Sequence, residues 1–331
     1  MPDENRLNED FLAKSEYYAA VMEDTILPYL KEKEKVIPVK GTDDRELYCV
    51  TYDADAPRGA VLVLHGFTES TYKFSEVIYS LLRNGFSVAA YDQRGHGRSW
   101  RDERVRWDMS LTHVDRFEEY VEDLERVYEQ VLSKMPGPRM SFSHSMGGAV
   151  TALYLEKHPD HFDRAALCAP MIAPRRSGVP LFAILGICGA EKALGKAAKR
   201  IFLSRPYAGP EDFATSCATD KNRFDWYDAV KAARKEFSNN GPTYGWTLES
   251  MNVTGKILKK GAVERIACPV RLYSAENDSS VLNEPQEQFI ARVKKGERML
   301  VKGARHEIYR STDEVLFPWW KDVLAFLKAE N

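Results

Sequence analysis

The chain has 331 residues, of which 44% are hydrophobic, and its 47 basic and 49 acidic side chains give a formal net charge of −2. This composition excludes a disordered or fibrous protein, and it argues against a basic protein that coats nucleic acid. The five cysteines form no CxxC or Cys/His cluster, so we predict neither a disulfide framework nor a metal site. The polar, acidic amino terminus (MPDENRLNEDF) lacks the apolar stretch of a secretory signal, which predicts a cytoplasmic protein.

Short apolar runs alternate with helical patterns along most of the chain. This alternation predicts an α/β fold in which helices flank a mostly parallel central sheet. The predicted strands are 46–52, 60–64, 87–91, 139–143, 164–169, 270–274 and 298–301. The predicted helices are 75–84, 114–135, 146–158, 283–293 and 312–328. Apolar residues recur at three- and four-residue spacing over 114–135, which makes this the clearest helical pattern.

The alternation stops between about residues 171 and 263 and returns at Cys268. We therefore predict a core formed by residues 1–170 and 264–331, and a helical cap (lid) formed by residues 171–263 and inserted between two core strands. The cap contains an apolar run, 179–190, that is too short to cross a bilayer.

Basic residues flank this apolar run of the cap: Arg175, Arg176, Lys192, Lys196, Lys199, Arg200 and Arg205. Two interpretations stay open. The run forms the wall of an acyl-chain tunnel, with a basic rim that meets phosphate groups or a membrane surface. Alternatively, the cap helices simply pack on the core and present a solvated basic face.

The segment SFSHSMGGA, residues 141–149, carries the first chemical signal. A strand-like run leads into Ser145, whose neighbours are small, and a helical pattern follows. A nucleophile elbow needs this arrangement, because the serine sits on a sharp turn between strand and helix. The usual pattern is Gly-x-Ser-x-Gly; here Ser143 replaces the first glycine, while Gly147 is kept. The competing interpretation is a glycine-rich helix start without chemistry.

The segment VLVLHGFTES carries the second signal. In enzymes with this elbow, one oxyanion-hole amide comes from a loop after an early strand, and the other from the residue after the nucleophile. We assign these backbone amides to Phe67 and Met146, and we interpret His65 as a structural residue that orders the loop. In AAYDQRGHGRSW, Asp92 and His96 precede Ser145, so we expect them to shape the site rather than to form a catalytic pair.

The segments SAENDSSV and VKGARHEI carry the last signal. A serine hydroxyl needs a base within hydrogen-bond reach, and the base needs an acceptor that fixes its tautomer. His306 lies in a loop after a predicted strand, and it is the one histidine beyond His161. We predict Ser145, Asp278 and His306 as the catalytic residues, with Glu276 as the competing acid.

Together these motifs resemble the α/β-hydrolase superfamily, and more closely its branch of bacterial lysophospholipases and monoacylglycerol lipases. The residues that carry the resemblance are HGFTES, YDQRGHGRS, SHSMGG, the Asp278 loop and KGARHEI. The resemblance covers about residues 60–169 and 268–328. It implies a Ser-Asp-His triad, ester hydrolysis through an acyl-enzyme, and neither a metal nor an organic cofactor.

We therefore expect a serine carboxylester hydrolase that acts on single-chain acyl lipids. We also expect peripheral contact with a membrane surface through the cap, and we expect no nucleic-acid partner. Two alternatives are a peptidase and a small-ester esterase on the same fold. A third is a ligand-binding protein that kept the fold without turnover.

Overall fold

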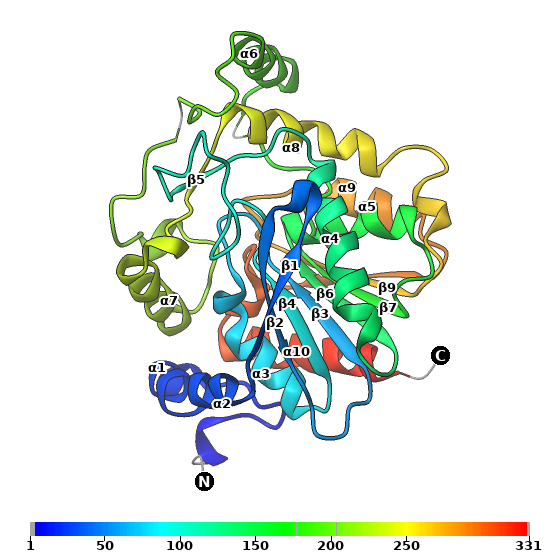
Figure 1. Ribbon diagram of the computed structural model, residues 1–331. Helices are drawn as coiled ribbons and strands as arrows, with labels where there is room; N and C mark the ends of the chain where they lie inside the picture. The colour runs from blue at the N-terminus through cyan, green and yellow to red at the C-terminus, as the bar shows by residue number, and fades with distance from the viewer. Residues whose placement is uncertain (1–3, 177, 203, 330–331) are drawn as a thin grey trace.

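An eight-stranded sheet runs through the computed structural model, which describes residues 4–176, 178–202 and 204–329 (Figure 1). Its strands, in spatial order, are β1 (Lys35–Lys40), β2 (Glu46–Tyr52), β4 (Ser87–Tyr91), β3 (Ala60–Leu64), β6 (Arg139–His144), β7 (Arg164–Cys168), β9 (Val270–Ala275) and β10 (Gly296–Val301). β2 runs antiparallel to β1 and β4, and every other pair of neighbours in this sheet is parallel. The mostly parallel sheet confirms the predicted fold class.

Helices flank this sheet on both faces (Figure 1). In chain order, the helices of the described residues, whether or not they flank the sheet, are α1 (Tyr18–Val21), α2 (Leu27–Lys33), α3 (Ser75–Arg83), α4 (Glu118–Gln130), α5 (Met146–Lys157), α6 (Leu181–Ala193), α7 (Lys221–Ala233), α8 (Tyr244–Ile257), α9 (Asn283–Ile290) and α10 (Asp313–Lys328).

The side chains of β3 show how the sheet divides the core. Leu62 and Leu64 belong to a buried cluster with residues of α4, α5, α8 and α9. Val61 and Val63 point to the other face and join a cluster with residues of α3, α10, α1 and α2. Because successive strand residues face opposite sides, a strand covered on both faces is apolar throughout. All five residues of β3 are accordingly buried.

The predicted helix over 114–135 is too long at both ends, since α4 covers only Glu118–Gln130. At Val131 the backbone leaves the helical region, with φ −125° and ψ −69°, and a short 3₁₀ turn follows. Val114 and Val131 are nevertheless buried in the same core cluster as the helix. The apolar periodicity therefore continues past the helix, because the flanking residues also face the core.

Two amino-terminal features are absent from the sequence-based prediction. β1 is a polar edge strand, in which only Val39 is buried, so its alternation is weak. The helices α1 and α2 are short and are joined by a π-helical segment, Met22–Ile26. Both helices are too short to show a recognisable periodic pattern of apolar residues.

Between β7 and β9 the chain forms α6, α7 and α8 (Figure 1). A two-residue strand, β8 (Gly241–Pro242), pairs there with β5 (Leu111–Thr112). Figure 1 shows α6 as the helix farthest from the sheet, with α8 between the two. Within the described residues, every helix is too short or too polar to span a lipid bilayer. The division of the chain into a core and a cap stays a prediction.

Candidate active site

Ser145 occupies the sharp turn between β6 and α5. Its backbone has φ 50° and ψ −115°, which is a strained conformation for a residue with a side chain. Two hydrogen bonds hold the turn: the Ser145 amide donates to the Cys168 carbonyl at 3.0 Å, and the Met171 amide donates to the Ser145 carbonyl at 2.8 Å. This backbone has the conformation of a nucleophile elbow.

Close packing around the turn explains the small residues of the motif. A Cβ atom on Gly147 would lie 2.5 Å from the backbone oxygen of Leu64. The buried hydroxyl of Ser143 instead forms a 2.7 Å hydrogen bond with the Thr151 hydroxyl. Serine therefore fits where the usual motif has its first glycine, because α5 supplies a polar partner.

Three predicted side chains meet at this turn. Nε2 of His306 lies 2.8 Å from Oγ of Ser145, and Nδ1 of His306 lies 2.8 Å from Oδ2 of Asp278. All three residues are buried, with exposed fractions of 7% for Ser145, 4% for Asp278 and 6% for His306. The arrangement links a hydroxyl, an imidazole and a carboxylate in the order that a general base needs.

The two candidate acids have different surroundings. The other oxygen of Asp278 accepts the amides of Ser280 and Val281 at 2.8 and 2.9 Å. Burial alone would raise the pKa of Asp278, but the facing His306 and these amides lower it below its usual value. Glu276 is exposed and accepts the Gly303 amide at 2.9 Å. Of the two acids, Asp278 is thus the one that contacts His306.

The backbone positions assigned to an oxyanion hole flank Ser145. Phe67 follows the end of β3, and Met146 is the first residue of α5. A Cβ atom on Gly66 would lie 2.9 Å from Cβ of Ser145, so glycine lets this loop approach the serine closely. The Phe67 ring is stacked on Trp246 of α8 with a centroid distance of 3.9 Å, which fixes the loop from the other side.

The family of the chain is given by comparison with known proteins. Residues 55–313 match the model of a hydrolase family described as serine aminopeptidase, S33. The chain belongs to the S33 serine aminopeptidase family.

The chain is also similar in sequence to two named hydrolases. Lysophospholipase L2 of Escherichia coli strain K12 is 31% identical over 336 residues, which cover 98% of this chain and 96% of that protein. The monoacylglycerol lipase of Mycolicibacterium smegmatis is 31% identical over 152 residues, or 46% of this chain and 49% of that protein.

Solved structures show the same fold. A soluble variant of monoglyceride lipase from Saccharomyces cerevisiae, in complex with a substrate analog, has a TM-score of 0.68 at 22% sequence identity. The match covers 89% of this chain and 96% of that chain. The S33 member described here therefore has the α/β-hydrolase fold, as its sequence resemblance implies.

In this S33 member a buried ion-pair network lies directly behind Ser145. The carboxylate of Glu69 accepts hydrogen bonds from four partners. They are the Gly66 amide at 2.6 Å, His144 Nδ1 at 2.8 Å, Lys73 Nζ at 3.2 Å and the Tyr309 hydroxyl at 2.5 Å. Glu69 thereby connects the loop after β3, the residue before Ser145 and the segment after His306. The local sequence pattern does not predict this role of Glu69.

A weak sequence signal for this network exists. Glu69 is the acidic residue of HGFTES, and His144 directly precedes the elbow serine. A buried acid in a short motif is a reason to search for a cationic partner, since unpaired buried charges are costly. Lys73 lies four residues away, but the second partner, His144, lies 75 residues away, so spacing in the sequence does not identify it.

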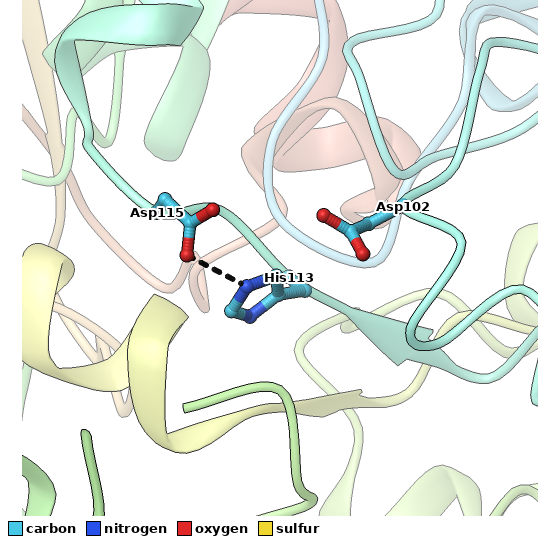
Figure 2. Close-up of side chains that lie close together, drawn as sticks. All are labelled: Asp102, His113 and Asp115. Atoms are coloured by element: carbon cyan, nitrogen blue, oxygen red, sulfur yellow. Dashed lines mark hydrogen bonds and ion pairs between the residues drawn. The ribbon is translucent and has the colours of Figure 1, made fainter. Parts of the chain in front are cut away.

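A separate polar group lies on the loop before α4. Atoms of Asp102, His113 and Asp115 that could bind a metal lie within 4.8 Å of one another (Figure 2). Arg104 Nη2 lies 2.6 Å from a carboxylate oxygen of Asp102 and 2.6 Å from one of Asp115. The guanidinium already forms ion pairs with both acids, and we assign no metal to the group.

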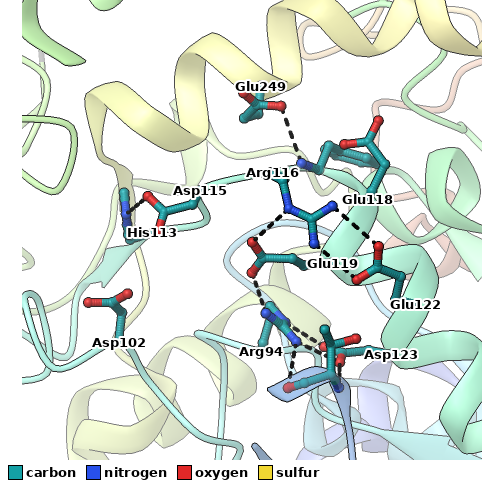
Figure 3. A network of polar contacts seen from close by, with 12 residues as sticks. Arg94, Asp102, His113, Asp115, Arg116, Glu118, Glu119, Glu122, Asp123 and Glu249 are labelled. Atoms are coloured by element: carbon teal, nitrogen blue, oxygen red, sulfur yellow. Dashed lines mark hydrogen bonds and ion pairs between the residues drawn. The ribbon is translucent and has the colours of Figure 1, made fainter. Parts of the chain in front are cut away.

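The group of Asp102, His113 and Asp115 lies next to a wider ion-pair network that connects α4 to the loop of Arg94 (Figure 3). The buried guanidinium of Arg94 binds both oxygens of Asp123, at 2.6 and 2.7 Å, and also contacts Glu119. The Arg94 loop belongs to the segment AAYDQRGHGRSW. The contacts thus hold that loop against the helix. The expected role of Asp92 and His96 in shaping the site stays a prediction.

Proposed function

We propose that this S33 family member is a serine carboxylester hydrolase that acts through an acyl-enzyme on single-chain acyl lipids. The observation that carries the proposal is the pair of 2.8 Å contacts that join His306 to Ser145 and to Asp278. The lysophospholipase and monoacylglycerol lipase among its relatives support the lipid substrate class.

In the proposed reaction Ser145 Oγ attacks the ester carbonyl carbon, and its proton passes to Nε2 of His306. The carbonyl oxygen becomes an oxyanion, which the amides of Phe67 and Met146 stabilise with hydrogen bonds. Asp278 holds the imidazole in position and stabilises its charged form. When the carbon–oxygen bond to the alcohol breaks, His306 gives the proton to the leaving oxygen.

Water completes the cycle. It attacks the acyl-serine carbonyl and gives a proton to His306, and this proton returns to Ser145 as the fatty acid leaves. Each step uses side chains and backbone amides of this chain, so the proposed reaction needs neither a metal nor an organic cofactor.

We assign residues 171–263 to a cap that meets the lipid surface, and α6 is its contact element. Among the described residues of this region, the large apolar side chains that are exposed are Leu181, Phe182, Ile187, Leu194 and Phe202. Phe182 is 78% exposed and Leu194 66%, which is costly in water but favourable in an acyl layer. The exposed cations Arg175, Arg176 and Lys199 would face anionic lipid head groups.

The proposal is tested by turnover of a p-nitrophenyl ester and by labelling with a fluorophosphonate probe. We expect both in the wild type and neither in Ser145→Ala. Ser133→Ala is the matched control, because the Ser133 hydroxyl donates to the Glu129 carbonyl, on α4, and not to a residue of the proposed triad. Unchanged turnover in Ser145→Ala would remove the nucleophile assignment, and a folded wild type that does not label would support a non-catalytic binding protein.

A second candidate function is supported by the family description, serine aminopeptidase. The proposed triad does not distinguish an ester from an amide. Aminoacyl-arylamides compared with monoacylglycerol and lysophospholipid substrates separate the two, and a small ester such as p-nitrophenyl acetate separates a small-ester esterase. Faster cleavage of the arylamides would favour the peptidase.

A further inference from the structure

The loop that carries the proposed oxyanion amide of Phe67 has a strained backbone. Thr68, the next residue, has φ 63°, in the left-handed region that a β-branched residue rarely enters. Such a conformation persists only where the surrounding structure imposes it. The loop from Gly66 to Glu69 therefore depends on contacts with other parts of the chain to keep the Phe67 amide in place.

Polar contacts hold this loop next to Phe67. The Gly66 amide donates to the Glu69 carboxylate at 2.6 Å. Before it, the Gln93 backbone amide donates to Nε2 of His65 at 2.9 Å, and the Gln93 side-chain amide donates to the His65 carbonyl at 2.6 Å. None of these three bonds involves Phe67 itself, so its position depends on a contact of another kind.

Trp246 of α8 supplies that contact. The rings of Trp246 and Phe67 are stacked, with centroids 3.9 Å apart and an angle of 26° between their planes. Phe67 is half-buried, and Trp246 is 7% exposed and belongs to the same buried cluster as Leu64 at the end of β3. Stacked aromatic rings attract each other beyond the apolar area that they bury. The stack thus holds the residue to which one oxyanion amide is assigned.

Trp246 is itself fixed at the first turn of α8. Its amide donates to the hydroxyl of Thr243, the N-cap residue, at 3.2 Å. The same hydroxyl lies 2.7 Å from Nδ1 of His113, and the Thr243 amide donates to the Thr112 carbonyl at 3.1 Å. A Cβ atom on Gly245 would lie 2.6 Å from Cε1 of His113, so this turn packs directly against the segment before α4. An indole with a fixed base can position the ring on which it stacks.

We propose that Trp246 is a positioning residue for the oxyanion hole. It acts through the Phe67 ring and keeps the Phe67 amide directed at the oxygen of the tetrahedral intermediate. This inference rests on the proposed function and adds a side chain of α8 to the groups that set its rate. Because the oxyanion forms during the reaction and not on substrate binding, the contribution of Trp246 belongs to kcat rather than to KM.

The test replaces the indole and measures p-nitrophenyl ester hydrolysis per active site, with active sites counted by complete fluorophosphonate labelling. Trp246→Leu removes the stack but keeps an apolar side chain, and Trp246→Phe keeps a ring. We expect kcat of Trp246→Leu to fall about thirtyfold, with KM changed less than about threefold. This loss is smaller than the roughly 10²–10³ for removal of one oxyanion donor, because the amide is displaced and not lost. Trp246→Phe should restore kcat to about a third of the wild-type value or more.

A trifluoromethyl ketone with an apolar chain gives a second measurement. Ser145 Oγ adds to its carbonyl carbon, the serine proton passes to His306, and the former carbonyl oxygen becomes an anion in the proposed hole. Its inhibition constant should rise in Trp246→Leu by the same factor by which kcat/KM falls. A side chain that only stabilises the fold would lower the melting temperature without changing this constant.

A double-mutant cycle tests whether the Phe67 ring carries the effect. Phe67→Leu removes the ring and keeps the backbone amide. If Trp246 acts through that ring, the double variant Phe67→Leu, Trp246→Leu loses no more kcat than the more damaging single variant. Losses that multiply in the double variant would contradict the inference.

Trp226→Leu is the matched control. Trp226 lies on α7, is 8% exposed and stacks on Tyr72 with a centroid distance of 6.0 Å, but it belongs to the buried cluster on the other face of the sheet. We expect a lower melting temperature, with kcat and the inhibition constant of the ketone within about twofold of the wild type. Equal kinetic losses in Trp226→Leu and Trp246→Leu would show a general effect of lost packing and overturn the inference.

The inference is also overturned if Trp246→Leu keeps the wild-type kcat and ketone affinity. If Trp246→Leu does not fold, Phe67→Leu decides the question, because it removes the same stack from the other side and should lower kcat by a similar factor. A wild type that neither hydrolyses the ester nor binds the ketone would contradict the proposed function. Hydrolysis by the wild type and an equal kcat in Trp246→Leu would contradict this inference and leave the proposed function standing.

Discussion

His144 connects Glu69 to the backbone of His306. Its Nδ1 lies 2.8 Å from a carboxylate oxygen of Glu69, and its Nε2 lies 3.2 Å from the carbonyl oxygen of His306. Burial opposes both charges, yet His144 and Lys73 lower the pKa of Glu69 well below its usual value, and Glu69 raises the pKa of His144. Because both partners are acceptors, a charged imidazole that donates from both nitrogens satisfies the site. This ion pair positions the loop that carries the proposed base.

The first prediction concerns Glu69→Gln. The substitution leaves His144 and Lys73 without their shared counter-charge, and breaking a buried ion pair costs about 3 kcal/mol. We expect a lower melting temperature and a kcat reduced about tenfold or more, with a smaller change in KM, because the His306 loop loses its anchor. Thermal unfolding and steady-state kinetics with a p-nitrophenyl ester measure the two effects. An unchanged kcat in a folded variant would show that the pair has no positioning role.

The second prediction separates the two candidate acids. Asp278→Asn should reduce kcat/KM by about 10⁴, because the imidazole loses the acceptor that fixes its tautomer. Glu276→Gln is the matched control, since Glu276 is exposed and its carboxylate accepts the Gly303 amide. We expect its activity to stay within twofold of the wild type. Equal losses in both variants would argue against the assignment of Asp278.

The third prediction concerns stability and pH. Burial raises the pKa of Glu156, on α5, from 4.5 to about 8. An acid whose pKa is raised by folding favours the folded state only while it is protonated, so the contribution of Glu156 to wild-type stability falls as pH rises from about 4.5 to about 8. Glu156→Gln stays neutral. Its melting temperature should therefore exceed that of the wild type increasingly over this range, with a constant gain above pH 8.

Thermal unfolding of both proteins between pH 5 and pH 9 checks this expectation. Glu284→Gln serves as a comparison, because Glu284 is an exposed acid whose side chain accepts a hydrogen bond from Gln288. A difference between Glu156→Gln and the wild type that does not change with pH would contradict the prediction.

The fourth prediction tests the proposed contact of α6 with lipid. The double variant Phe182→Asp, Leu194→Asp removes two exposed apolar side chains, each worth about 1.5–3 kcal/mol when fully buried. We expect its binding to anionic phospholipid vesicles to fall at least tenfold in a sedimentation assay. Val36→Asp is the control, because Val36 is a 53% exposed apolar residue on the edge strand β1. Equal vesicle binding by all three proteins would remove the proposed contact.

The elements of the fold that can be predicted from the sequence are those with a clear local pattern of apolar residues. The buried strands β3 and β4 are short apolar runs, and each is covered on both faces. The limits of α4 are not predictable in the same way, because Val114 and Val131 face the core without being helical. At both ends of the pattern 114–135, the residues are apolar because they are buried and not because they are helical.

The elbow around Ser145, the loop after β3 and the chain order of Ser145, Asp278 and His306 are properties of the sequence by itself. Steric crowding at a sharp turn selects small neighbouring residues, and the alternation of strands and helices selects regular apolar patterns. Both can therefore be recognised in residues that are close together in the sequence. The tertiary structure alone decided which acid contacts His306 and which side chains bind the buried carboxylate of Glu69. These depend on distances between residues up to 240 positions apart, and electrostatic and hydrogen-bond energies follow separation in space rather than position along the chain.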